Sequence, residues 1–205
     1  MTKTALTLTA ASAALFAAAP AFAGPSGYAT GDTVSNMTVT DSNGTEHQLS
    51  DFAGKTVVLE WTNDGCPYVK KHYNTDNMQG LQKEATADDV VWLSIISSAP
   101  GKQGHVSGEE ANALTTSRGA APTAVVLDEA GVAGRTFAAK TTPHMYIIDG
   151  EGTLRYQGAI DDNPSSNPAT VADATNHVKV ALAEMAAGQA VSTTDTQPYG
   201  CSVKY

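Results

Sequence analysis

The amino-acid sequence predicts an α/β domain in which a mixed central β-sheet is flanked by helices. Residues 55–61 and 90–96 are continuous apolar runs with the length of strands that are buried on both faces of a sheet. A helical pattern follows each run, and a tight turn at residues 150–152 joins two further strand patterns in a hairpin. Alternating strands and helices that end in a hairpin are typical of a sheet with both parallel and antiparallel pairs.

The first 23 residues differ in composition from the rest of the 205-residue chain. Lys3 is their lone cation, and it precedes an apolar run rich in alanine and threonine that ends at Ala21, Phe22 and Ala23. The run is short for a membrane anchor and ends in a small-x-small pattern, so residues 1–23 indicate an export signal that is cleaved near Ala23. We therefore expect a periplasmic or otherwise exported protein, without stable membrane insertion after cleavage.

The mature chain is expected to form one domain at residues 24–187 and a tail at residues 188–205. An irregular arm leads into an N-terminal β-hairpin, because the Asn43-Gly44 pair supplies the positive φ that a tight hairpin turn needs. Pro67 suits the first turn of a helix, which the polar residues 74–76 interrupt or bend. The expected elements are, in order, strands at 37–39, 46–49 and 55–61, a helix from residue 67, a strand at 90–96, a loop rich in glycine at 99–108, a helix at 109–118, a strand at 124–127, a helical turn at 132–138, strands at 145–149 and 153–157, and a helix at about 169–187.

Charge and cysteine content exclude several functions. Lys and Arg number 12 against 21 Asp and Glu, and the resulting net charge of −9 gives an acidic surface that repels phosphate backbones. Nucleic acid is therefore not an expected partner. The chain has 2 cysteines, too few for a four-cysteine zinc site but enough for one disulfide bond.

Cys66 is the first candidate for chemistry. It lies between a predicted buried strand and a helix that begins at Pro67, so its sulfur faces the positive end of the helix dipole. Lys70, Lys71 and His72 follow within two turns and add positive potential, which also favours the thiolate. The alternative is an ordinary buried cysteine.

Three motifs resemble those of a known fold family. Residues 66–69, Cys-Pro-Tyr-Val, resemble the Cys-Pro-Tyr-Cys active site of the glutaredoxins and thioredoxins, with valine in place of the second cysteine. The Thr-Pro pair at residues 142–143 is similar to the cis-proline loop of thioredoxin-fold proteins. The segment at residues 52–59 resembles the redoxin branch, the alkyl hydroperoxide reductase and thiol-specific antioxidant family. The resemblance covers residues 30–185 and implies a thioredoxin-like fold with an N-terminal β-hairpin and a C-terminal tail.

The resemblance also implies roles for individual residues. Cys66 matches the nucleophilic cysteine, and Pro67 and Tyr68 beside it belong to the surface that meets the substrate. Pro143 matches the cis-proline that lies against the sulfur. Thr142 would offer its backbone to an extended peptide, which is recognition by strand addition.

Glu60 falls where thioredoxins keep a buried carboxylate that moves protons during exchange. A carboxyl group inside an otherwise apolar strand suits a general base. The alternative is a strand residue that faces solvent.

The chain also departs from the pattern of its resemblance. Val69 removes the second cysteine of the active-site turn, so the motif cannot form a disulfide within itself. The redoxin peroxidases keep a proline and a threonine where this chain has Leu59 and Asn63. Thr62, Arg118 and Arg135 carry suitable groups for peroxide activation, but their spacing does not assign them to it. Disulfide exchange is therefore favoured over peroxide reduction.

Cys201 in the tail has three compatible roles. It could be a resolving cysteine for Cys66, one half of a permanent structural disulfide, or a free thiol. With 2 cysteines in an oxidising compartment, we favour a Cys66–Cys201 disulfide in some functional state. Cys66, Cys201 and His144 could together bind a soft metal such as Cu(I), but the motif of two cysteines in one loop is missing, so we expect no metal and no cofactor.

The sequence thus predicts a thiol–disulfide oxidoreductase in which Cys66 is the nucleophile and Cys201 resolves the intermediate. Its expected partners are a protein or small-molecule disulfide and an external thiol reductant. The alternatives are a thiol peroxidase that acts on hydroperoxides, and a non-catalytic thioredoxin-fold module with an inert disulfide or a soft metal.

Overall fold

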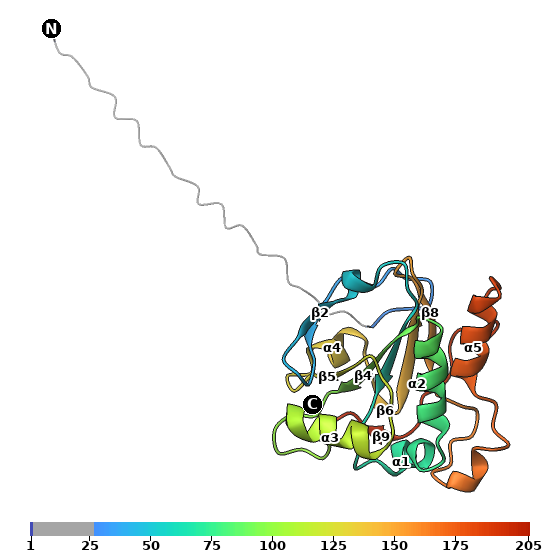
Figure 1. Ribbon diagram of the computed structural model, residues 1–205. Coiled ribbons are helices and arrows are strands. Elements are labelled where there is room, and N and C mark those ends of the chain that lie inside the picture. Colours follow the sequence, from blue (N-terminus) through green and yellow to red (C-terminus); the bar gives the residue numbers. More distant parts are fainter. Residues whose placement is uncertain (2–26) are drawn as a thin grey trace.

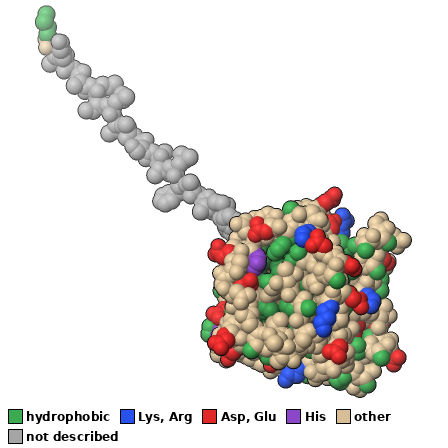
Figure 2. All heavy atoms as spheres, viewed as in Figure 1, with side chains coloured by type: hydrophobic (Ala, Val, Ile, Leu, Met, Phe, Trp, Pro, Cys, Tyr) green, Lys and Arg blue, Asp and Glu red, His purple; other side chains and the backbone are tan. Residues whose placement is uncertain are grey.

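The computed structural model describes Met1 and residues 27–205, and the remainder is the thin grey trace in Figure 1. The expected export signal therefore lies outside the described residues. Across the part of the chain that is described, no helix has both the length and the apolar character to cross a membrane. On the face shown in Figure 2, acidic and basic side chains are scattered and do not gather into one patch.

A five-stranded mixed sheet forms the centre of the molecule, as the sequence predicts. The central strand β3 (Val57–Trp61) pairs in parallel with β4 (Val91–Ile96) and antiparallel with β7 (His144–Ile148). The edge strands are β5 (Ala124–Leu127), parallel to β4, and β8 (Leu154–Gly158), antiparallel to β7. The three central strands are buried along their whole length, which is why their sequences are continuously apolar apart from a few polar residues.

Helices cover both faces of this sheet (Figure 1). On one face, α1 (Pro67–Tyr73), α2 (Asn77–Ala87) and α5 (His177–Ala186) pack against Val58 and Met145. On the other face, Phe137 at the end of α4 (Val132–Thr136) packs against Trp61 and Tyr146. The helix α3 (Gly108–Ser117) packs through Ala111 near the β5 edge.

Local sequence signals place most of the remaining elements correctly. The hairpin of β1 (Thr38–Thr40) and β2 (Glu46–Gln48) forms around Gly44 at φ 80°, and a short 3₁₀ helix follows at Leu49–Phe52. The helix from Pro67 is interrupted where expected, since Asp76 at φ 57° separates α1 from α2.

The predicted extent of the last helix is wrong. Instead of one helix over 169–187, a 3₁₀ turn at Pro168–Thr170 precedes α5, which begins only at His177. The Asn176 side chain accepts a hydrogen bond from the Lys179 N–H and so caps the helix at that point.

The C-terminal tail is folded against the domain and forms a short strand that the sequence did not predict. It runs along the β8 edge, where the Gln157 N–H donates to the Thr194 carbonyl at 3.0 Å and the Thr196 N–H donates to the Gln157 carbonyl at 3.1 Å. Further on, β9 (Cys201–Ser202) pairs antiparallel with β6 (Thr141–Thr142), directly before the cis Thr142–Pro143 bond. The tail therefore crosses the end of the sheet at which β3 leads into α1.

Candidate active site

Cys66 is the N-cap residue of α1 and is held in place by the loop before it. Its N–H donates to the Asn63 carbonyl at 3.1 Å, and the Asn63 side chain in turn bonds Gly65 N–H at 2.9 Å and the Gln103 carbonyl at 3.0 Å. Asn63, at the position where the peroxidases keep a threonine, thus stabilises the loop that precedes Cys66. The Cys66 thiol donates to the Thr142 carbonyl at 3.1 Å, and the residue is 0% exposed.

Cys201 lies directly beside Cys66. In the β6–β9 pair, Cys201 is opposite Thr142, whose carbonyl is also the partner of the Cys66 thiol. Both cysteines are free, and each is close enough to shift the pKa of the other. Gly200 permits this approach, because a side chain there would collide with the Thr142 carbonyl, and its φ of 138° is one that glycine adopts readily.

The surroundings of the two thiols shift their pKa values in opposite directions. Burial raises the pKa of Cys66, but the Cys201 thiol and the Val69 N–H in the first turn of α1 stabilise the thiolate and leave the net pKa lowered. Burial and the hydrogen bond to Cys66 raise the pKa of Cys201 to about 11. Of the two, Cys66 is therefore the better nucleophile near neutral pH.

The expectation that Lys70, Lys71 and His72 help to lower the pKa of Cys66 is wrong. Lys71 is buried and forms an ion pair with Asp161 at 3.2 Å, so its charge is already compensated. Burial lowers the pKa of His72 to about 4, which leaves the ring neutral at physiological pH. Lys70 is exposed to solvent. The helix end and the thiol–thiol hydrogen bond stabilise the thiolate instead.

Tyr68 and Pro67 lie next to the thiols, where the resemblance places the substrate surface. Pro67 is exposed and Tyr68 is half-buried, and the Tyr68 ring meets the Tyr199 ring of the tail edge-on at 5.8 Å. The backbone edge at Thr142 is already paired with the tail. The structure thus brings the expected substrate-binding residues together. The backbone edge that would pair with a substrate peptide is, however, already paired with the tail of the chain.

Glu60 is 0% exposed, so the solvent-facing alternative is wrong. It projects to the same face of the sheet as Val58, the face on which Cys66 packs. Its carboxylate accepts four hydrogen bonds, from Tyr73 Oη at 2.8 Å, Gln82 Nε2 at 3.0 Å, Trp92 Nε1 at 2.9 Å and Ser94 Oγ at 2.9 Å. A buried charge held by this many donors is compatible with the interior.

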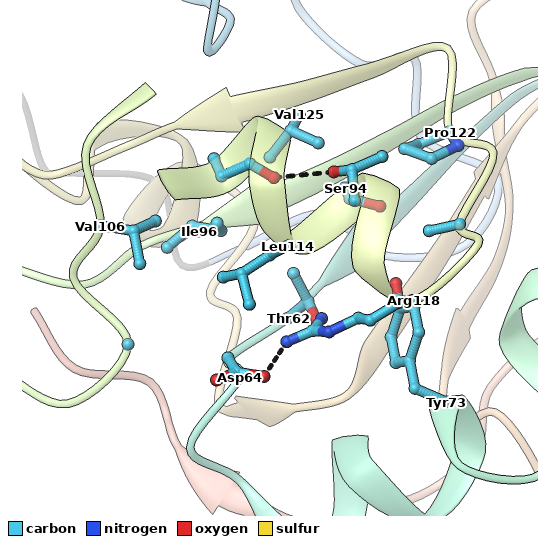
Figure 3. Close-up of a pocket in the computed structure, with 14 residues that line it drawn as sticks. Thr62, Asp64, Tyr73, Ser94, Ile96, Val106, Leu114, Arg118, Pro122 and Val125 are labelled. Atoms are coloured by element: carbon cyan, nitrogen blue, oxygen red, sulfur yellow. Dashed lines mark hydrogen bonds and ion pairs between the residues drawn. The ribbon is translucent and has the colours of Figure 1, made fainter. Parts of the chain in front are cut away.

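A small cavity of about 30 Å³ lies beside this carboxylate network (Figure 3). Thr62 and Arg118 both line it, together with Ser94 and Tyr73. Arg118 forms an ion pair with Asp64 across the cavity, and the Thr62 hydroxyl is buried without a hydrogen-bond partner. Cys66 does not belong to the lining, so this polar pair is not arranged around the thiol.

Arg135 and His144 are also directed away from Cys66. The Arg135 guanidinium lies over the Tyr205 ring at 4.7 Å. His144 follows the cis-proline, but its ring packs at a tilt against Tyr146, with 4.5 Å between the ring centroids, and accepts a hydrogen bond from Lys140 N–H at 3.2 Å. Tyr146 belongs to the core cluster on the face of the sheet opposite to Cys66. The expected proximity of His144 to Cys66 is therefore not seen.

Residues 30–157 match the family model of the AhpC/TSA family. The chain belongs to the AhpC/TSA family. No curated protein matches the sequence of this AhpC/TSA member.

Solved structures of bacterial proteins share its fold. An uncharacterized conserved protein from Geobacillus kaustophilus aligns with a TM-score of 0.74 at 21% identity, over 88% of this chain and 94% of that one. A hypothetical protein from Sinorhizobium meliloti 1021 gives 0.73 at 20%, over 87% and 95%. The thioredoxin domain of a thiol-disulfide oxidoreductase from Bacteroides vulgatus gives 0.50 at 20%, over 63% and 88%. The AhpC/TSA chain thus has the thioredoxin-like fold of the redoxin branch.

Cys66 is expected to alkylate faster than Cys201 at neutral pH, because the pKa of Cys66 is lowered and burial raises that of Cys201 to about 11. The measurement is iodoacetamide labelling of the reduced protein between pH 5 and 11, with peptide mapping of each cysteine. Each single Cys→Ser variant serves as a control for peptide assignment. Equal labelling rates near pH 7 would contradict this assignment.

The free energy of unfolding is expected to fall as pH decreases from about 6.5 to 4. Burial lowers the pKa of His72 to about 4 and that of His144 to about 3, so the unfolded chain binds protons that the native state does not. Each histidine contributes a slope of about 1.4 kcal/mol per pH unit in this range. Urea titrations of the reduced protein at several pH values measure it.

One variant isolates this histidine contribution. His144→Gln should remove about half of the slope, because one of the two buried histidines is then absent. An unchanged slope in the His144 variant would show that the acid sensitivity arises elsewhere.

Proposed function

We propose that this AhpC/TSA-family protein is an exported thiol–disulfide oxidoreductase that uses Cys66 as nucleophile and Cys201 as resolving cysteine. The observation that carries the proposal is the pairing of Cys201 with Thr142, which holds its thiol against that of Cys66. Export, with removal of residues 1–23, would place both thiols where disulfides form and persist.

The tail supplies the second thiol that the active-site turn lacks. Val69 occupies the position of that cysteine in the motif, and its side chain is buried in the core between α1 and the sheet. Cys201 belongs to the C-terminal tail and lies beside the Cys66 sulfur. A resolving thiol on a tail that pairs through a two-residue strand could approach and leave, as an exchange reaction requires.

Two exchange steps convert a substrate disulfide into two thiols. The Cys66 thiolate attacks one substrate sulfur, the substrate S–S bond breaks, and the other substrate sulfur leaves as a thiolate. Cys201, once deprotonated, then attacks Cys66 Sγ, so that a Cys66–Cys201 disulfide forms and the second substrate thiolate leaves. We assign the proton acceptor role to Glu60, supported by its burial on the same face of the sheet.

An external thiol reductant would reset the pair. Cys201 is half-buried while Cys66 is fully buried, so Cys201 is the more accessible of the two residues. Attack on its sulfur would release Cys66, whose lowered pKa makes it the better leaving group. Two electrons and two protons are taken up, and both cysteines return to thiols.

Access to Cys66 requires movement of the tail. The residue is covered, and the peptide edge at Thr142 is paired with Cys201. A substrate peptide in extended conformation would use the same backbone groups and the neighbouring Pro67, Tyr68 and Pro143. Substrate and tail would therefore compete for one edge, which links substrate binding to release of the resolving cysteine.

Cys66→Ser is expected to abolish exchange with a small disulfide, and Cys201→Ser is expected to stop after one mixed disulfide on Cys66. Oxidation of wild type by hydrogen peroxide should proceed at about the rate of free cysteine, because Thr62 and Arg118 line a cavity to which Cys66 does not belong and Arg135 lies over Tyr205; each such donor is typically worth about 10²–10³-fold. Stopped-flow kinetics and intact mass measure both reactions.

Free cysteine at the same pH is the control for the peroxide reaction. A peroxide rate far above this control, lost in Cys66→Ser, would overturn the proposal in favour of a thiol peroxidase. A Cys66–Cys201 disulfide that resists reduction by thiols would favour an inert structural bridge.

A further inference from the structure

A buried polar cluster lies under the tail at the side of α1. Lys71 and His72 come from α1, Asp161 from the segment after β8, and Tyr199 from the tail. Lys71 and His72 have side chains that are 0% exposed, and that of Asp161 is 2% exposed. None of these groups has a part in the exchange steps above, although the cluster connects the helix that begins at Cys66 with the tail that carries Cys201.

The Tyr199 hydroxyl uses its full hydrogen-bonding capacity in this cluster. It donates to Asp161 Oδ1 and accepts from Lys71 Nζ at 3.4 Å. The Asn77 amide donates to His72 Nδ1 at 2.8 Å, so the neutral ring carries its proton on Nε2 and donates to Tyr199 Oη at 3.3 Å. One donated and two accepted bonds satisfy the hydroxyl completely.

Tyr199 is two residues before Cys201 in the chain, and Lys71 is five residues after Cys66. The cluster therefore fixes the tail to α1 at a short distance along the chain from each cysteine. On the other side of Cys201, the tail is held by backbone bonds, from Val203 N–H to the Lys140 carbonyl at 3.1 Å and from Ala99 N–H to the Lys204 carbonyl at 2.8 Å. Immediately before Cys201, the side-chain hydrogen bonds of Tyr199 are the anchor, and backbone pairing with Gln157 holds the tail only further back, at Thr196.

We propose that Tyr199 is the positioning residue that seats Cys201 against Cys66, a role that rests on the proposed disulfide exchange. The hydroxyl adds one donor to Asp161 and one acceptor to Lys71 in a buried ion pair that is otherwise bonded to Asn163, and this holds the β6–β9 pair in register. The effective concentration of the Cys201 thiol at Cys66 then depends on one hydrogen-bonded hydroxyl group.

Tyr199→Phe tests the proposal, because it keeps the ring that packs on Tyr68 and removes only the hydroxyl. We expect the Cys66–Cys201 disulfide to become about tenfold less stable relative to the dithiol, since buried Asp161 and Lys71 each lose a partner. For a two-electron couple, tenfold raises the reduction potential by about 30 mV. Equilibration of the full chain with glutathione buffers, analysed by mass spectrometry, measures it.

Tyr205→Phe is the matched control. It removes a tail hydroxyl that donates to the Ala139 carbonyl at 3.0 Å, outside the cluster. We expect the same reduction potential as wild type in this variant, even where thermal stability falls. An equal shift in both variants, or no shift in Tyr199→Phe, would overturn the positioning role and leave Tyr199 as a general tail contact.

A second measurement separates this inference from the proposed function. Displacement of Cys201 removes a hydrogen bond from the Cys66 thiolate, so alkylation of Cys66 in reduced Tyr199→Phe should shift to higher pH, and that in Tyr205→Phe should not. An unchanged profile in Tyr199→Phe contradicts the inference. If wild type forms no reducible disulfide, the proposed function fails, while this profile still decides the role of Tyr199.

Discussion

The antiparallel pairing of Cys201 with Thr142 is the contact on which the rest of the site depends. The Thr142 carbonyl is opposite Cys201 and also accepts the hydrogen bond of the Cys66 thiol, so one backbone group fixes both sulfurs. The same pairing buries Cys66, occupies the peptide edge and stabilises the thiolate through the neighbouring thiol. The acidity of the Cys66 thiol and the access to it consequently depend on one two-residue strand.

The tail carries the second cysteine that the turn at residues 66–69 lacks. Val69 stands where the motif would have its second cysteine. The side chain of Asn63, at the position of the peroxidase threonine, is used in hydrogen bonds that stabilise the loop. Cys201, 135 positions further along the chain, reaches Cys66 through a docked tail. The AhpC/TSA fold provides the edge for docking, because the cis-proline loop presents free backbone groups there.

The sequence predicts what is encoded locally. Continuous apolar runs identify β3 and β4, Asn43-Gly44 identifies the first hairpin, and Pro67 marks the start of α1. The start of α5 was also encoded, since Asn176 is a strong N-cap residue. Burial of Lys71 could not be predicted, because its partner Asp161 is 90 positions away and nothing local marks the pair.

The pairing of the tail with β6 could not be predicted for the same reason, although an approach of Cys201 to Cys66 was expected. Residues 199–203 show no strand periodicity, and β9 is only two residues long, so its existence depends on an edge formed by distant residues. Contacts of this kind are decided by tertiary structure rather than by propensity.

Hydrogen exchange of the tail in the reduced protein tests the central claim most directly. The amides of Val203 and Ala99 are each bonded across the tail junction, to the Lys140 and Lys204 carbonyls. If docking of the tail alone brings the thiols together, both amides should exchange much more slowly than an unstructured chain before any disulfide has formed. Exchange of both amides at the unstructured rate would contradict the account.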